Sequence, residues 1–109
     1  MKKPTGHVTF LFTDIEGSTK LAQDFSEALP YALERHNTIM REAVELNNGF
    51  IFKMIGDAFC CAFGNADEAV RAATDAQIKL NSEKWKDAVI KVRMGIHTGK
   101  SEWNGSDYM

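Results

Sequence analysis

Two aspartates, Asp14 and Asp57, stand at the ends of apolar segments that have the composition of β-strands. The first is followed by 17–19, a glycine and two hydroxyl residues at the expected start of a helix. Neighbouring carboxylates repel one another unless a cation neutralises them, and their hard oxygens suit Mg²⁺ or Mn²⁺. Backbone N–H groups at a helix start suit an anion. Together these residues predict a divalent-metal site beside a phosphate site.

Each of these features also has an ordinary structural interpretation. An aspartate at a strand end is commonly a turn or cap residue, and Asp-x-x-Gly-Ser-Thr is a common helix start. Residues 55–57 (Ile-Gly-Asp) have the composition of a hairpin turn, and on the ordinary interpretation Lys53 is a solvated strand lysine. The joint occurrence of these features favours the chemical interpretation, provided that the fold brings them together.

The elements that would position these residues alternate between strand and helix patterns. Residues 8–15 predict a strand with apolar side chains on both faces, so we expect both faces to be covered. A helix should begin at 17–19, with Ser18 or Thr19 as its cap. A second helix is expected over 27–47, where Pro30 either kinks it or lies in its first turn.

The second half of the chain predicts a hairpin, a helix and a strand. Residues 50–54 and 58–63 read as two strands joined through 55–57, and 65–80 as an alanine-rich amphipathic helix. Residues 91–98 alternate between apolar and polar side chains, so their polar face should look toward a cleft or a partner. Residues 103–106 have the composition of a turn.

The order β-α-α-β-β-α-β predicts an α+β fold, a ferredoxin-like α/β sandwich with its helices on one sheet face. A right-handed crossover makes the first two strands parallel, and the third strand then lies between them. The start of the third strand, at Asp57, should therefore lie beside the end of the first strand, at Asp14. This topology would unite the two carboxylates.

Length and composition fit one domain spanning residues 1–109, with 44% hydrophobic residues and a net charge of −2. The mixed charges form no basic stripe, so we expect no nucleic-acid partner. The apolar runs are too short for a membrane span within this chain, and the N-terminus does not resemble a signal peptide. Adjacent Cys60 and Cys61 point to opposite strand faces and suit a reducing cytoplasm.

Four segments together resemble the catalytic domain of class III adenylate and guanylate cyclases. The resemblance covers residues 6–109, and it rests on 12–19, 52–57, 92–99 and 106–109. It implies the nucleotide cyclase fold, which agrees with the topology expected above. It also implies an active site between two subunits, and hence a homodimer, with metal ligands from one chain and base-reading residues from the other.

The resemblance implies a role for each matching position. Two Mg²⁺ or Mn²⁺ ions per site would be held by Asp14, Asp57 and the main-chain carbonyl of Ile15. The triphosphate would be bound by Gly17, Ser18 and Thr19. Two metals at such a site activate a hydroxyl nucleophile and stabilise the leaving phosphate oxygens. The implied activity is an adenylate cyclase that forms 3′,5′-cyclic AMP and pyrophosphate.

Base selection is assigned by the same resemblance to Lys53 and Asp107. Adenine offers a ring-nitrogen acceptor and an amine donor, which complement a lysine and an aspartate. Guanine reverses that pattern, and family members that use GTP have a Glu/Cys pair at these positions. The sequence therefore favours ATP over GTP as substrate. Arg93 could face either a partner subunit or water, so the sequence gives it no role.

The family pattern continues beyond Met109 into a segment with an asparagine and an arginine, so we expect a truncated domain with little turnover on its own. The alternatives are a non-catalytic nucleotide-binding or dimerising cyclase-like module, or a guanylate cyclase. A cyclic-dinucleotide synthase is disfavoured, because the Gly-Gly-Asp/Glu turn of that group is absent. Product analysis separates these functions.

Overall fold

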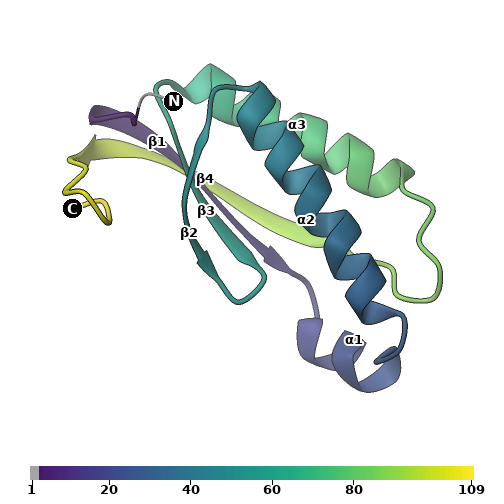
Figure 1. Ribbon diagram of the computed structural model, residues 1–109. Helices are drawn as coiled ribbons and strands as arrows, with labels where there is room; N and C mark the ends of the chain where they lie inside the picture. The colour runs from purple at the N-terminus through teal and green to yellow at the C-terminus, as the bar shows by residue number, and fades with distance from the viewer. Residues whose placement is uncertain (1–2) are drawn as a thin grey trace.

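A four-stranded antiparallel sheet in the order β2-β3-β1-β4 organises the protein. The computed structural model describes residues 3–109 (Figure 1). The strands are β1 (Gly6–Ile15), β2 (Phe50–Ile55), β3 (Ala58–Phe63) and β4 (Val92–Ser101). As predicted from the crossover rule, β3 lies between β2 and β1 and runs antiparallel to both.

Two long helices cover one face of this sheet. The helices are α1 (Ser18–Asp24), α2 (Leu29–Leu46) and α3 (Ala66–Ser82), and Figure 1 shows α2 and α3 side by side on the same side of the strands. The element order and the α+β sandwich with helices on one face are therefore confirmed. The other sheet face is left without a helix, and Asp14 of β1 and Lys53 of β2 line pockets on it.

The main core fills the space between the sheet and these two helices. Leu11, Phe59 and Phe63 project from the strands into it and are fully buried. Fully burying a side chain of this kind contributes about 1.5–3 kcal/mol. From α3 the core receives mainly alanines, Ala69, Ala72 and Ala76, whose small size lets the helix approach the sheet closely.

A sharp turn carries the chain from α2 into β2. Asn48 adopts a left-handed φ of 62°, and the N–H of Gly49 donates to the Val44 carbonyl at 2.8 Å. A Cβ at Gly49 would lie 2.5 Å from the Phe63 ring, so only glycine fits this close approach. This turn fixes where the β2–β3 hairpin begins.

Several element boundaries differ from the predicted ones. Strands β1 and β4 are both longer, because their ladder runs without interruption from the Gly6–Ser101 pair to the Ile15–Val92 pair. Helix α2 begins at Leu29, two residues later than expected, and Pro30 lies in its first turn rather than at a kink. These shifts leave the topology unchanged.

The helix-free face of β1 is covered along only part of its length. Val8 is fully buried, and Phe10 packs edge-on against Tyr108 from the C-terminal segment at a centroid distance of 5.2 Å. Phe12, further along the strand, is 45% exposed. The expectation that both faces of β1 are covered is therefore right at Val8 and wrong at Phe12, because the C-terminal segment ends its cover before that point.

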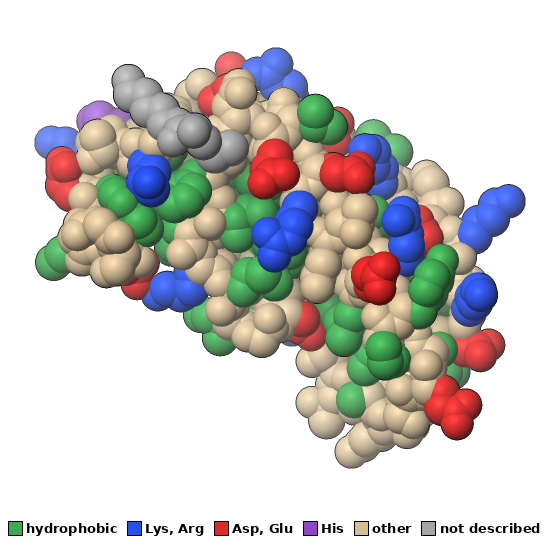
Figure 2. All heavy atoms as spheres, viewed as in Figure 1, with side chains coloured by type: hydrophobic (Ala, Val, Ile, Leu, Met, Phe, Trp, Pro, Cys, Tyr) green, Lys and Arg blue, Asp and Glu red, His purple; other side chains and the backbone are tan. Residues whose placement is uncertain are grey.

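The charged side chains are intermingled on the surface. On the face drawn in Figure 2, lysine and arginine side chains alternate with aspartate and glutamate. Among residues 3–109, no helix combines the length and the apolarity needed to cross a bilayer.

Candidate functional site

The predicted metal ligands lie at one end of the sheet, on neighbouring strands. The β1–β3 register pairs Thr13 with Phe59, and the N–H of Phe59 donates to the Thr13 hydroxyl at 3.2 Å. Asp14 follows Thr13 along β1, and Asp57 lies in the tight turn just before β3. The turn is narrow because Gly56 adopts a left-handed φ of 59°. The predicted neighbourhood of these two chain segments is thus confirmed.

The carboxylate of Asp14 has a partner that the sequence did not identify. Arg93 lies opposite Asp14 in the β1–β4 ladder. Its Nε donates to Oδ1 at 2.9 Å and its Nη2 donates to Oδ2 at 3.0 Å. The Arg93 side chain is 65% exposed and that of Asp14 is 50% exposed. A guanidinium group that donates two hydrogen bonds in this way binds an ionised carboxylate. The cationic group next to Asp14 in this structure is therefore the Arg93 side chain.

This end of the sheet is hollowed on its helix-free face. A pocket of about 360 Å³ includes Asp14 and Arg93 in its lining, together with Phe12, Ile55 and Cys60. Burial raises the pKa of the Cys60 thiol, so the thiol is protonated near neutral pH. The hollow is therefore mostly apolar, with a single ion pair at its rim.

A second ion pair joins β2 to the C-terminal segment. The ammonium of Lys53 donates to Oδ2 of Asp107, and the two side chains are 41% and 38% exposed. This hydrogen bond is the main cause that raises the pKa of Lys53 and lowers the pKa of Asp107. The two residues assigned to base selection are thus brought together, although the chain separates them by 54 positions.

The pocket around this second pair adjoins the first. It has a volume of about 440 Å³, and Lys53 and Asp107 line it with aromatic side chains of β1, β2 and the C-terminal segment. The two pockets share three lining residues: Phe12, Ile55 and Cys60. The helix-free face therefore carries two adjoining pockets, together called the depression below, with one ion pair in each.

The predicted phosphate-binding segment directly follows β1. Helix α1 has only seven residues, and Gly17 is its N-cap in a left-handed conformation with φ 64°. No side chain caps this helix, so the expected cap by Ser18 or Thr19 is wrong. A glycine at positive φ turns the chain directly and leaves both hydroxyl groups exposed. Ile15, just before the turn, is buried and pairs with Val92.

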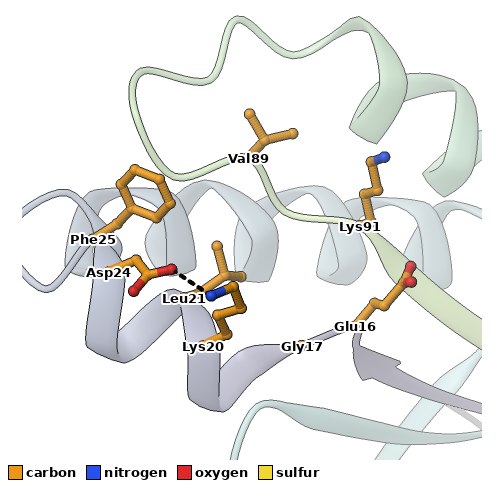
Figure 3. Close-up of a pocket in the computed structure, with 8 residues that line it drawn as sticks. All are labelled: Glu16, Gly17, Lys20, Leu21, Asp24, Phe25, Val89 and Lys91. Atoms are coloured by element: carbon orange, nitrogen blue, oxygen red, sulfur yellow. Dashed lines mark ion pairs between the residues drawn. The ribbon is translucent and has the colours of Figure 1, made fainter.

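A separate pocket of about 310 Å³ lies beyond this turn, between α1 and the segment that enters β4 (Figure 3). Its polar lining includes Glu16 and Lys91, and Lys20 pairs with Asp24 at 3.1 Å. Neither Asp14 nor Asp57 is among its lining residues. It therefore does not belong to the depression described above.

The donor set suits a hard divalent ion that takes part of its coordination from a substrate. Within residues 3–109, no group of three His, Cys, Asp or Glu side chains is placed to hold a metal. Mg²⁺ is commonly bound by one or two carboxylates, with water and substrate phosphates completing its shell. Asp14 and Asp57 fit that mode, since Asp14 already attracts a cation and Asp57 lies in the adjacent turn.

Comparison with known proteins identifies the family of this chain. A family model described as the adenylate and guanylate cyclase catalytic domain matches residues 1–102. The chain belongs to this cyclase family. An adenylate cyclase of Lachancea kluyveri is 36% identical over 116 aligned residues, which cover 88% of this chain and 6% of the relative. The cyclase chain thus matches a small part of that much longer protein.

Solved cyclase structures share the fold. A structure of adenylate cyclases from Trypanosoma brucei in their monomeric state superposes with a TM-score of 0.85 at 25% identity, and it covers 100% of this chain. A dimeric guanylyl cyclase domain from the aquatic fungus Blastocladiella emersonii gives 0.77 at 21% identity and covers 91%. The cyclase chain spans 65% and 60% of these two structures, respectively.

Proposed function

We propose that this cyclase chain forms part of an adenylate cyclase that converts ATP into 3′,5′-cyclic AMP and pyrophosphate. The observation that carries this proposal is the Lys53–Asp107 ion pair, which stands in a pocket that adjoins the one containing Asp14. In a homodimer whose sites take metal ligands from one chain and base-reading residues from the other, both sets must face the partner. Asp14 and the Lys53–Asp107 pair line adjoining pockets on the same helix-free face, as such a dimer requires.

The metal half of the surface would serve the phosphoryl transfer. Asp14, Asp57 and the Ile15 carbonyl would hold two Mg²⁺ or Mn²⁺ ions. Such ions, when bound, neutralise the triphosphate and lower the pKa of the attacking hydroxyl. In the reaction the ribose 3′-oxygen gives its proton to solvent water and bonds to the α-phosphorus, while the bond from that phosphorus to the leaving pyrophosphate oxygen breaks. Exposed Gly17, Ser18 and Thr19 would bind the triphosphate.

The base half of the surface would select adenine. Lys53 supplies a donor for a ring nitrogen, and Asp107 supplies an acceptor for the exocyclic amine. The raised pKa of Lys53 and the lowered pKa of Asp107 keep both side chains charged around neutral pH. The pair therefore offers the pattern that complements adenine and opposes guanine.

A second cyclase subunit would complete the site, in a homodimer. Phe12 is 45% exposed and Ile55 is 64% exposed, and both line the shared floor of the depression. Large apolar side chains in that position favour cover by a partner.

The free, buried thiols of Cys60 and Cys61 suit a reducing compartment, so the proposed location is the cytoplasm.

Calorimetry of Mn²⁺ with a non-hydrolysable ATP analogue tests the proposal, with the corresponding GTP analogue run in parallel. We expect metal-dependent binding that favours the ATP analogue and that is lost in Asp14→Asn. Asp87→Asn, which changes an exposed carboxylate in the segment before β4, is the matched control and should bind normally. Equal binding by Asp14→Asn would contradict the metal assignment.

Product analysis addresses the other candidate functions. Cyclic AMP formed by the whole protein supports adenylate cyclase, and cyclic GMP would identify a guanylate cyclase. Nucleotide binding without a product would identify a non-catalytic nucleotide-binding or dimerising module. Low turnover by the 109-residue chain alone stays a prediction, and a rate of about 1 s⁻¹ or more would contradict it.

A further inference from the structure

The segment after β4 folds into a small hairpin that presents Asp107. Glu102 and Met109 exchange two main-chain hydrogen bonds of 3.1 and 3.0 Å, and Trp103 bridges to Tyr108. Gly105, at the tip, has a φ of 100°, a conformation that favours glycine. The hairpin thus has a defined backbone, and Asp107 lies on its returning limb.

Asn104 makes most of the polar contacts inside this hairpin. Its side-chain oxygen accepts hydrogen bonds from the N–H of Asp107 at 2.8 Å, the N–H of Ser106 at 2.9 Å and the Ser106 hydroxyl at 3.2 Å. Its own N–H donates to the carbonyl of Asp107 at 3.0 Å. Asparagine is suited to this role, because its short side chain can replace a main-chain acceptor in a turn. Asn104 therefore holds both the N–H and the carbonyl of Asp107.

The carboxylate of Asp107 is held by two further hydrogen bonds. Its Oδ1 accepts the N–H of Tyr108 at 2.8 Å, which leaves Oδ2 for Lys53. Tyr108 is itself anchored, since its hydroxyl donates to the Pro4 carbonyl at 2.8 Å and its ring packs edge-on against Phe52. Tyr108 thus holds the carboxylate of Asp107, whereas Asn104 holds its main-chain N–H and carbonyl.

We propose that Asn104 is a positioning residue for base selection, which sets the choice between ATP and GTP by holding Asp107 against Lys53. This inference rests on the proposed function, since it assumes that Asp107 contacts the purine. Asn104 is exposed and contacts no core residue through its side-chain hydrogen bonds, so its replacement should leave the fold intact. Its effect would reach the nucleotide only through Asp107.

The test measures the affinity ratio of the ATP and GTP analogues in the presence of Mn²⁺. We expect Asn104→Leu, which keeps the size but removes the acceptor, to lower the ratio about five- to tenfold. Asn104→Asp retains the acceptor and should keep most of the wild-type preference for the ATP analogue. Ser106→Ala removes only the weakest of the three contacts and should leave the ratio within about twofold.

Two further measurements separate positioning from general damage. In an Asp107→Ala background, Asn104→Leu should change the ratio no further. A carboxyl NMR titration needs no nucleotide: the pKa of Asp107, lowered in the wild-type chain, should move back toward its ordinary value in Asn104→Leu.

An unchanged ratio and an unchanged Asp107 titration in Asn104→Leu would overturn the inference while leaving the proposed function intact. The inference would also be overturned if Asn104→Leu lowered the affinity ratio in the Asp107→Ala background as much as it does in the wild-type chain. A wild-type chain that binds neither analogue would overturn the proposed function, and the inference with it.

Discussion

The two ion pairs on the helix-free face look alike but differ in what they join. Our proposal assigns both Lys53 and Asp107 to base selection, and under that proposal the ion pair already stands in its working arrangement. Arg93 and Asp14 differ, because a cationic side chain occupies the carboxylate that would bind a metal. Both pairs are partly exposed, so neither contributes much to the stability of the fold.

This difference implies two kinds of binding on one surface. At the base half, the hairpin and the aromatic packing around Tyr108 hold the pair before any ligand arrives, so little ordering is needed. At the metal half, a divalent ion bound as proposed would compete with the Arg93 guanidinium for Asp14. Metal affinity should therefore include a competition that base selection lacks.

The largest expected effect comes from removing a metal ligand. Asp57→Asn should weaken Mn²⁺ binding at least about hundredfold, since loss of even an outer-sphere partner can cost tenfold to hundredfold. Isothermal titration gives the affinity, and circular dichroism checks that the variant is folded. Asp87→Asn is again the matched control. Normal Mn²⁺ binding by Asp57→Asn would mean that the metal half depends on Asp14 alone.

The next largest effect concerns base selection by Lys53 and Asp107. Combining Lys53→Glu with Asp107→Cys installs the pair found in family members that use GTP, and it should invert the analogue preference by about tenfold to hundredfold. Discrimination stays below that of a fully enclosed site, because the pair is partly exposed. Competition binding measures the ratio. Retained preference for the ATP analogue would assign base selection to other residues.

A smaller effect tests the competition at the metal half. Arg93→Gln should tighten Mn²⁺ binding about two- to fivefold in the absence of nucleotide, because Asp14 no longer has a competing cation. Lys91→Gln removes a positive charge two positions earlier in the chain and should give a smaller change. Equal effects of the two substitutions would indicate a general charge effect rather than competition for Asp14.

Much of this arrangement follows from sequence patterns, because strand alternation and crossover handedness are general. They place the start of β3 beside the end of β1, and hence Asp57 near Asp14, without knowledge of side-chain contacts. The meeting of Lys53 with Asp107 does not follow from them. It depends on the course of the segment after β4, and only the family resemblance assigned the two residues to one task.

The features that were missed depend on register and on loop detail. A strand pattern fixes which face a residue occupies, but sliding β4 by two residues would keep Arg93 on its face and change its partner. The cap of α1 was wrong because residue preferences favour serine or threonine, whereas Gly17 turns the chain by its positive φ. The role of Asn104 needs side-chain hydrogen bonds that composition alone does not give.

The smallest expected effect concerns what lies beneath the metal half. His36 on α2 is fully buried, packs edge-on against Phe59 and has no hydrogen-bond partner at Nε2 within the described residues. Burial lowers its pKa below 6.5 in the folded state. The unfolded chain therefore binds more protons, and stability is full above about pH 6.5 and falls as the pH drops toward the folded-state value.

Between pH 7 and 6 this linkage lowers the free energy of unfolding by at most about 0.7 kcal/mol. His36→Leu should remove that loss. Aspartate and glutamate side chains ordinarily titrate at lower pH, so we expect the buried His36 to dominate this range. Urea unfolding at the two pH values measures it, and the difference between them is compared rather than the absolute stability. A loss of the same size in His36→Leu would show that the acid sensitivity arises from other groups.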